Sequence, residues 1–594
     1  LETQRILQEI EEKKLIGIVL AGRPYHADPA INHSIPDLIN QLGMAVLSED
    51  GIAMMQDSKF PPLRVLNQWT WHSRLYRSAD YVTRHADLEL VELNSFGCGL
   101  DAVVTDQVQE IMSKRNRLYT SLKIDQSMNL GAVRIRLRSL KAAIGERMQE
   151  KGSVAPILYP KAEFTPEMRG TFTILAPEMS PIHFPLIRDA VRSAGYNVEV
   201  LPPVRADIDT GLSFVNNDAC YPAIITIGSL MRALLSGTYD LSRTAVILSQ
   251  TGGACRASNY IGFLHKALDN AGLSRIPVIS LNTRNLEPQS GFRLTFTPVS
   301  FTLIRRLIKA AIYGDALQQC LYRTRPYEKS PGSAETLYRK WQDICCKSLI
   351  KGCSFHRFAQ NISHLVKDFD RLPLNKMERR PRIGIVGEIY VKFSPIASND
   401  IVRSIEANGG EAETSGMLDF FLYGLLDSHF QWKHLDGTFS DNLKDTFGRY
   451  LLEWYRRPLE KAVKISKRFH EITNITRLAK RAARFLSLGN RAGEGWFLTA
   501  DMTDLLHHGC RGIICLQPFG CLPNHITGEG MIHKLHMAYP EAVFLPLDCD
   551  ASASEANQEN RLKLMMNSLT EKETHEKTLP FIRNTISVRK GKVL

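Results

Sequence analysis

The sequence predicts an α/β protein of three doubly wound domains, each built on a parallel sheet of the flavodoxin-like or Rossmann-like type. Three observations support this prediction. Short apolar runs that end in glycine alternate with segments of helical periodicity, as expected of strands buried on both faces of a sheet. The chain has 594 residues, which is too long for one hydrophobic core. An internal repeat relates its beginning to its last third.

The first domain is expected at residues 1–150. An amphipathic helix leads into an apolar strand, a turn follows at Arg23, and a helix then ends at Gly43. A later strand is followed by Cys98 and another helix. The predicted strands cover residues 15–22, 45–47, 88–94 and 118–124, and the predicted helices cover residues 1–13, 35–42 and 100–112. Strands that alternate with helices indicate a doubly wound sheet.

The second domain is expected at residues 151–370. Cys220 stands directly before a predicted helix, in which Pro222 suits the first turn and which extends to Leu235. Cys255 lies in a glycine-containing loop between a strand and a helix. The predicted strands cover residues 172–176, 198–201, 244–248 and 277–281, and helical periodicity marks residues 187–194, 260–270 and 303–369.

The third domain is expected at residues 371–594 and repeats the first. The strand at residues 383–387 matches the first strand of the chain, and Phe-Gly-Cys at residues 519–521 matches the same tripeptide at residues 96–98. An aspartate follows 27 residues after each of these cysteines, at Asp125 and Asp548. A mainly helical insertion at residues 417–498 distinguishes the third domain.

The net charge of +12 is compatible with an anionic partner. Much of the excess lies between Arg456 and Arg484, where ten basic residues accompany two acidic ones. We interpret this stretch mainly as a solvated helical face, and a docking surface for an acidic partner is the alternative. No zinc-finger spacing or aromatic RNA-binding signature accompanies the charge, so we expect no nucleic acid partner.

The location of the protein follows from what the sequence contains. No apolar stretch approaches the ~18–20 residues that span a bilayer, and no secretory signal opens the chain. We therefore expect a cytoplasmic protein without a membrane partner. Eleven cysteines in such a chain indicate a reducing compartment, where thiols are free, metal-bound or catalytic.

Four cysteines lie among turn residues where a strand gives way to a helix: Cys98, Cys220, Cys255 and Cys521. Ligands of open α/β sheets bind beyond the carboxyl ends of the strands. Helix N-termini there favour a thiolate and can donate hydrogen bonds to cluster sulfurs. Single cysteines from different domains are what an interdomain iron–sulfur cluster needs, and they escape a search for CxxC pairs.

The remaining cysteines are weaker candidates. Cys515 lies within a predicted strand, six residues before Cys521, and Cys549 adjoins Asp548. For the other five, packing is the favoured interpretation: Cys320, Cys345, Cys346, Cys353 and Cys510.

Other chemistries are less well supported. Structural zinc sites use paired ligands at short spacing, and the only close pair is the adjacent Cys345 and Cys346. No GxxxxGK[ST] loop is present, and no complete GxGxxG follows a strand. His26 and His525 could act as a catalytic acid or contact a substrate, but a loop histidine without special role is the simpler reading. The catalytic residues are therefore unknown, and an acyl-transfer cysteine would need a Cys/His pair that sequence cannot place.

Four segments resemble the C-terminal region of large CoA-enzyme activases, which are relatives of the 2-hydroxyglutaryl-CoA dehydratase activators. They are GRPYHADP at residues 22–29, NSFGCG at 94–99, NNDACYP at 216–222 and CLQPFGCLPNH at 515–525. More distantly, the second and third domains resemble dehydratase subunits and double-cubane-cluster proteins. The resemblance implies an oxygen-sensitive iron–sulfur cluster held by Cys98, Cys220, Cys255 and Cys521, with Cys515 next. A [4Fe–4S] cluster is the simplest expectation, and a double cubane, to which Cys549 could contribute, is the second.

The resemblance also implies partners. In the large family members an acetokinase/Hsp70-like ATPase portion precedes this region; its phosphate-binding loops are absent here and the chain begins at Leu1. We therefore expect that portion upstream in the same polypeptide, a dehydratase-like or reductase-like electron acceptor, and compatibility with a homodimer. Three functions stay open: low-potential electron transfer driven by ATP hydrolysis in the ATPase portion, a cluster enzyme that itself reduces or dehydrates a small substrate such as a CoA thioester, and a cluster-free scaffold that docks the ATPase.

Overall fold

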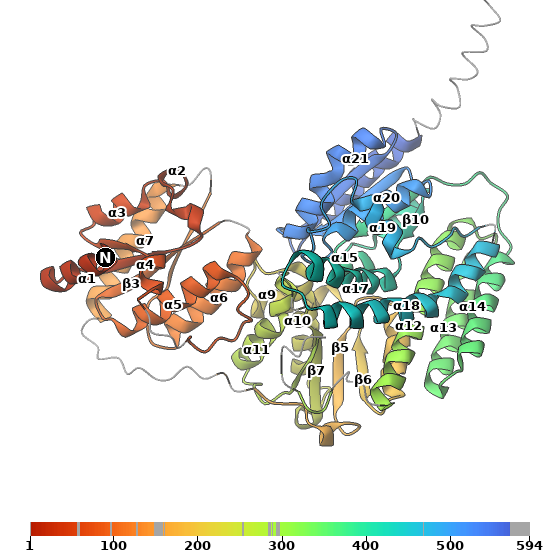
Figure 1. The fold of residues 1–594 in the computed structure, drawn as a ribbon, viewed down its shortest axis with the longest axis horizontal. Coiled ribbons are helices and arrows are strands. Elements are labelled where there is room, and N and C mark those ends of the chain that lie inside the picture. Colours follow the sequence, from red (N-terminus) through yellow and green to blue (C-terminus); the bar gives the residue numbers. More distant parts are fainter. Residues whose placement is uncertain are drawn as a thin grey trace, which may run out of the picture. The chain divides into compact units, whose positions relative to one another are not determined.

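The predicted fold class is confirmed by three four-stranded parallel sheets with flanking helices (Figure 1). The computed structural model describes residues 2–55, 60–95, 98–125, 129–147, 159, 161–251, 253, 255–282, 287, 289–292, 298–466 and 468–570. The predicted boundary between residues 150 and 151 lies outside these ranges, as do Phe96, Gly97, Gly252 and Ala254.

The first sheet has the strand order β2-β1-β3-β4. Its strands are β1 (Gly17–Ala21), β2 (Ala45–Ser48), β3 (Leu88–Ser95) and β4 (Thr120–Ile124). Its main helices are α1 (Glu2–Lys13), α3 (Ile35–Gln41), α5 (Thr70–Arg84), α6 (Gly99–Ser113) and α7 (Leu130–Arg147). Ile18, Val91 and Leu137 belong to one buried cluster, so strands and helices share a core. The sequence analysis did not predict α5, although its buried residues Leu75, Ala79 and Val82 recur at helical spacing.

The second sheet has the order β6-β5-β7-β8, and its strands β6, β5 and β7 lie side by side in Figure 1. Its strands are β5 (Thr173–Pro177), β6 (Asn197–Leu201), β7 (Thr244–Ser249) and β8 (Val278–Leu281). The helices are α8 (Phe184–Arg192), α9 (Arg205–Phe214), α10 (Tyr221–Leu235) and α11 (Tyr260–Asn270). This is the strand order of the first sheet, so the repeat extends to the second domain, which the sequence did not reveal.

The third sheet has the same order again, β10-β9-β11-β12. Its strands are β9 (Arg382–Gly387), β10 (Glu411–Thr414), β11 (Gly512–Pro518) and β12 (Val543–Cys549). The helices are α15 (Ile389–Phe393), α16 (Ile401–Ala407), α20 (Trp496–His507), α21 (Ile532–Ala538) and a helix over residues 555–570. β11 is buried along its whole length, as expected of a central parallel strand.

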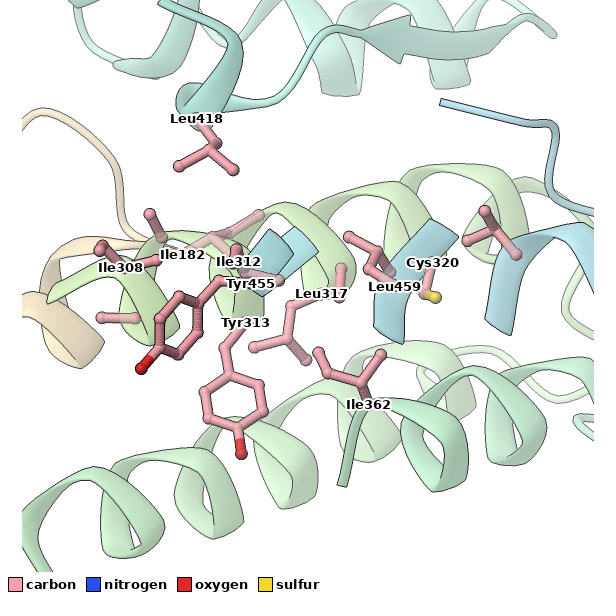
Figure 2. Packing of buried hydrophobic residues seen from close by; sticks show 14 of the residues in the cluster. Ile182, Ile308, Ile312, Tyr313, Leu317, Cys320, Ile362, Leu418, Tyr455 and Leu459 are labelled. Atoms are coloured by element: carbon pink, nitrogen blue, oxygen red, sulfur yellow. The ribbon is translucent and has the colours of Figure 1, made fainter. Parts of the chain in front are cut away.

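A further group of helices packs into a bundle, and its buried cluster also includes Leu186 of α8 and Trp496 of α20. The helices of the bundle are α12 (Pro298–Thr324), α13 (Ser333–Lys351), α14 (Phe355–Asp370), α17 (Met417–His434), α18 (Phe439–Ile465) and α19 (Ile475–Ala482). Figure 2 shows Tyr313 and Leu317 of α12 with Ile362 of α14, and Tyr455 and Leu459 of α18 in the same buried cluster. The two predicted helical regions therefore join in one bundle.

The chain divides into two compact units. The first unit comprises Leu1–Glu163, Leu212–Ile227 and Leu248–Glu287, and the second comprises Phe164–Gly211, Gly228–Ile247 and Pro288–Leu594. Among the described helices, none is long and apolar enough to cross a membrane.

Candidate functional site

Three candidate cysteines each follow the strand that comes third, in chain order, in its sheet. Cys98 comes three residues after the end of β3, Cys521 three residues after β11, and Cys255 six residues after β7. Cys220 lies between β6 and β7, directly before α10. Cys98, Cys220 and Cys255 belong to the first unit, whereas Cys515 and Cys521 belong to the second. All eleven cysteines are thiols.

Cys98 is the N-terminal cap residue of α6 and faces an arginine. Nη2 of Arg23 donates to Sγ of Cys98 at 2.8 Å, and Nε of the same guanidinium donates to Oδ1 of Asp101 at 2.7 Å. Asp101 also accepts from the backbone N–H of Ser95 at 3.0 Å. Burial and then Asp101 raise the pKa of the Cys98 thiol, while Arg23 and the first N–H groups of α6 oppose that rise. The strand end, helix start and arginine thus hold the sulfur in one position.

Cys255 and Cys220 are connected through Arg256. This arginine directly follows Cys255, and only 6% of its surface is exposed. Its Nη1 donates to the backbone oxygen of Asp218 at 3.3 Å, two residues before the buried Cys220. Cys220 also begins α10, because its backbone oxygen accepts the N–H group of Ala223 at 2.9 Å.

The same guanidinium lies against the loop of Cys98. A Cβ atom at Gly99 would lie 1.8 Å from Nη1 and 2.2 Å from Cζ of Arg256, so only glycine leaves room for this side chain. Gly99 directly follows Cys98. The loops of Cys98, Cys220 and Cys255 therefore meet around one buried arginine within the first unit.

Further contacts fix the Cys220 and Cys255 loops. Lys123, in β4, forms an ion pair with Asp218. The backbone oxygen of Gly253 accepts from Nε2 of Gln68 and from Oγ of Ser258, each at 2.6 Å. Lys123 and Gln68 are distant in sequence from the loops that they contact, whereas Ser258 is only five residues from Gly253, so the loop positions depend on the folded first unit as well as on a local bond.

Cys521 is buried in the second unit and accepts a hydrogen bond from a neighbouring amide. It is 5% exposed, and its Sγ accepts from Nδ2 of Asn524 at 3.1 Å. The backbone oxygen of Cys521 accepts from the N–H of His525, whose Nδ1 lies 3.0 Å from Oε2 of Glu529. The loop therefore leads directly into a helical segment, as predicted.

Cys515 and Cys549 are buried within the third sheet. Cys515 is 1% exposed and belongs to a hydrophobic cluster with Val386 and Met502. Burial raises the pKa of each of these two thiols to about 12. For Cys515 this environment is that of a core residue, and its role as a ligand stays a prediction.

The candidate histidine His26 has ordinary hydrogen-bond partners. Nδ1 of His26 accepts from the backbone N–H of Arg23 at 3.1 Å, and its Nε2 lies 3.2 Å from Oγ of Ser95. Burial lowers the pKa of His26, which favours a neutral ring that orders the turn after β1.

The donor chemistry of the first unit fits an anionic cluster. Thiols are soft ligands that suit iron–sulfur clusters or zinc, and two guanidinium groups and the starts of α6 and α10 supply positive charge beside them. That charge favours a cluster whose thiolate ligands are negative. Within the described ranges, however, no three His, Cys, Asp or Glu side chains are arranged to hold a metal ion. A metal site is therefore not preformed there.

Sequence reasoning found the cysteines but missed the residues that organise them: Arg23, Asp101, Asp218 and Arg256. Arg256 adjoins a candidate cysteine and Arg23 lies in the turn after β1, so the strand-end argument could have included both. Nothing local marks Asp218 as the partner of Arg256, because 38 residues separate them.

Comparison with known families relates the beginning of the chain to CoA enzyme activases. None of the curated proteins matches the chain. Residues 1–52 match the family model described as CoA enzyme activase uncharacterised domain (DUF2229), and this stretch includes β1, the turn at Arg23 and β2. The beginning of the chain is therefore similar to a domain of CoA enzyme activases.

Proposed function

We propose that the protein is the iron–sulfur region of a CoA enzyme activase-like system. In this proposal it carries low-potential electrons to a dehydratase-like or reductase-like acceptor, and a separate ATPase portion of the acetokinase/Hsp70-like type supplies the driving force. The match of residues 1–52 to an activase domain supports the system. The observation that carries the cluster proposal is the meeting of three cysteine loops around Arg256.

Each site residue of the first unit has a defined role in this proposal. Cys98, Cys220 and Cys255 supply thiolates to a [4Fe–4S] cluster, which when bound supplies one-electron transfer. Arg256 fixes the relative positions of the three loops. Arg23 donates to Sγ of Cys98 and stabilises its thiolate. Cys521 and Cys515 stay candidate ligands on the grounds of sequence.

Iron content tests the cluster. The chain, purified without oxygen, is expected to contain iron and sulfide and to give an EPR signal on reduction. The Cys98→Ser, Cys220→Ser and Cys255→Ser variants should each lose most of the iron. Cys346→Ser is the matched control, since this half-buried thiol lies in α13, outside the three loops, and its iron content should stay at the wild-type level.

Two results would refute the ligand assignment: no iron in the wild-type protein, or equal iron loss in the Cys346→Ser control. The same measurement on Cys521→Ser and Cys515→Ser decides whether either belongs to the ligand set. Addition of acyl-CoA then separates an electron carrier from an enzyme. A spectral change of the isolated chain would favour direct action on a CoA substrate, whereas no change would favour electron transfer.

A further inference from the structure

A narrow cavity lies in the second unit where β10 ends. It is lined by the last residues of β10 and by side chains of α12, α17, α18 and α20, and it encloses about 790 Å³ including its opening to solvent. Ligands of parallel sheets bind beyond the carboxyl ends of the strands, in cavities of this order of size. We call this cavity the β10 hollow, and its charged lining residues include Asp315, Arg323, Asp419, Arg456 and Asp501.

Arg456, in α18, carries a buried hydrogen-bond donor that has no partner. The residue is 2% exposed. Its Nη1 donates to Oδ1 of Asp419 at 2.5 Å and its Nε donates to Oε1 of Glu460 at 3.0 Å, whereas its Nη2 meets no acceptor among the described residues. A buried polar group without a partner is rare and costly, because folding has removed it from water. Arg456 therefore has room for an acceptor that a ligand can supply.

Asp419, in the first turn of α17, offers the matching acceptor. Arg456 donates to its Oδ1, and within the described ranges no hydrogen bond reaches its Oδ2. Burial raises the pKa of Asp419 to about 6 against the opposing effect of Arg456, and the carboxylates of Asp315 and Asp501 add to the rise. A cationic group bound beside Asp419 would relieve this repulsion among carboxylates. The ion pair of Arg456 and Asp419 thus presents one donor and one acceptor to a ligand.

The charge of the lining selects the class of ligand. Acidic side chains outnumber basic ones in the β10 hollow, so a phosphate or a dicarboxylate would be repelled. A polyamine would leave the free N–H group of Arg456 without an acceptor. A molecule with one carboxylate and one ammonium group satisfies both residues and adds no net charge. In an α-amino acid these two groups are attached to the same carbon atom, which suits a donor and an acceptor that belong to one ion pair.

A second buried guanidinium indicates the kind of side chain. Arg323 of α12 is 2% exposed and pairs with Glu413, and its Nη1 has no partner in the part of the chain that the structure describes. It therefore favours an amino acid whose side chain ends in an acceptor, and an amide oxygen supplies one without adding a negative charge. We propose that the β10 hollow binds a free α-amino acid with an amide side chain. Arg456 binds its carboxylate, Asp419 its ammonium group and Arg323 its amide oxygen.

Calorimetric titration of the 594-residue chain with L-glutamine tests the proposal. Glutamine should bind in a saturable manner. Glutaramate, which is glutamine without its amino group, should bind about tenfold or more weakly, because it loses the contact with Asp419 and brings an unbalanced negative charge. Leucine lacks the amide oxygen for Arg323 and should also bind about tenfold or more weakly. These comparisons use the wild-type protein, so they do not depend on the folding of a variant.

A pair of variants on one helix tests the role of Asp419. Asp419→Asn removes the charge that binds the ammonium group and should raise the dissociation constant of glutamine about tenfold or more. Asp427→Asn is the matched control, since Asp427 also lies in α17 and pairs with an arginine, Arg491, but is outside the lining of the β10 hollow; its affinity should stay at the wild-type level.

Three results would overturn the proposal: no saturable binding of glutamine at millimolar concentration, equal binding of glutaramate, or unchanged affinity in Asp419→Asn. Equal binding of leucine would overturn the assignment of the amide oxygen to Arg323. The β10 hollow belongs to the second unit, whereas the loops of Cys98, Cys220 and Cys255 belong to the first, so these titrations and the iron measurements decide separate questions.

Discussion

The contact between Arg256 and Gly99 predicts opposite effects of one substitution. Gly99→Ala should lower stability when Arg256 is present and raise it when Arg256 is absent. In the Gly99→Ala variant the new methyl group would lie 1.8 Å from Nη1 of Arg256. The guanidinium must then move by more than 1 Å to reach an ordinary contact distance, and its 3.3 Å hydrogen bond to Asp218 is lost. Gly99→Ala therefore breaks a bond that joins the cysteine loops.

The magnitude follows from two opposing effects. A hydrogen bond from a charged donor contributes about 1.5–3 kcal/mol. Alanine at the first position of α6 regains about 0.5–1 kcal/mol, because glycine loses more backbone entropy when the helix forms. The net loss of stability expected for Gly99→Ala is about 1–2 kcal/mol.

In a chain that also carries Arg256→Ala, we expect Gly99→Ala to raise stability instead of lowering it. Without the guanidinium the three atoms nearest to the new methyl group are gone, so Gly99→Ala should stabilise the loop by about 0.5–1 kcal/mol. Gly145→Ala is the control: Gly145 lies in α7 with no atom within 4 Å of its Cβ position, and its substitution should stabilise α7 in both backgrounds.

Hydrogen exchange measures these effects where they occur. The amide of Ala102 donates to the backbone oxygen of Cys98 and reports the start of α6, and the amide of Ala223 does the same for Cys220 and α10. Both should exchange faster in Gly99→Ala. A Gly99→Ala variant that is equally destabilised with and without Arg256 would refute the contact as the cause.

Three further predictions concern single side chains. Arg23→Gln removes a cation that lowers the pKa of Cys98, so alkylation of Cys98, followed by mass spectrometry, should slow several-fold at pH 8; an unchanged rate would contradict the 2.8 Å contact. Burial raises the pKa of Glu178 to about 7, so the folded state binds more protons than the unfolded state between about pH 4.5 and 7, and stability should fall as the pH rises through this range. Glu178→Gln should flatten that slope in urea unfolding and stabilise the second unit at pH 8 by about 1–3 kcal/mol; an unaltered slope would contradict the assignment. Cys515→Ser should destabilise the second unit more than Cys515→Ala, by about 1–3 kcal/mol, because the hydroxyl lies in an apolar cluster, and equal unfolding midpoints would argue against this core position.

The fold was predictable because parallel strands buried on both faces leave a strong trace in the sequence. The runs at β1 and β9 are nearly continuous in apolar residues, and their relation to each other was visible. The equivalence of the second sheet was not visible. Cys255 follows its strand by six residues instead of three, and no Phe-Gly precedes it. The second domain therefore lacks the local sequence motif that relates the first and third domains, although the strand order is shared.

The candidate site was predictable only in part, for a physical reason. A cysteine at a strand end is a local feature, and the sequence located four of them. Arg256 and Gly99 are 157 positions apart, and their contact depends on the absence of a Cβ atom at Gly99. The sequence around a glycine does not reveal which buried cationic side chain packs against it. The same limit applies to Arg23 and Cys98, which lie 75 residues apart.

The family match and the cysteine loops support the proposed function independently. The match ends at residue 52, before the first cysteine, and so concerns the activase-like part of the proposal rather than the cluster. The loops concern the cluster and would be equally informative without the match. Iron that is lost in Cys98→Ser, Cys220→Ser and Cys255→Ser but kept in Cys346→Ser would therefore establish the ligands even if the acceptor were not of the dehydratase type. An iron-free wild-type protein would refute the cluster but leave the similarity of residues 1–52 to an activase domain unchanged, because that match does not depend on the thiols.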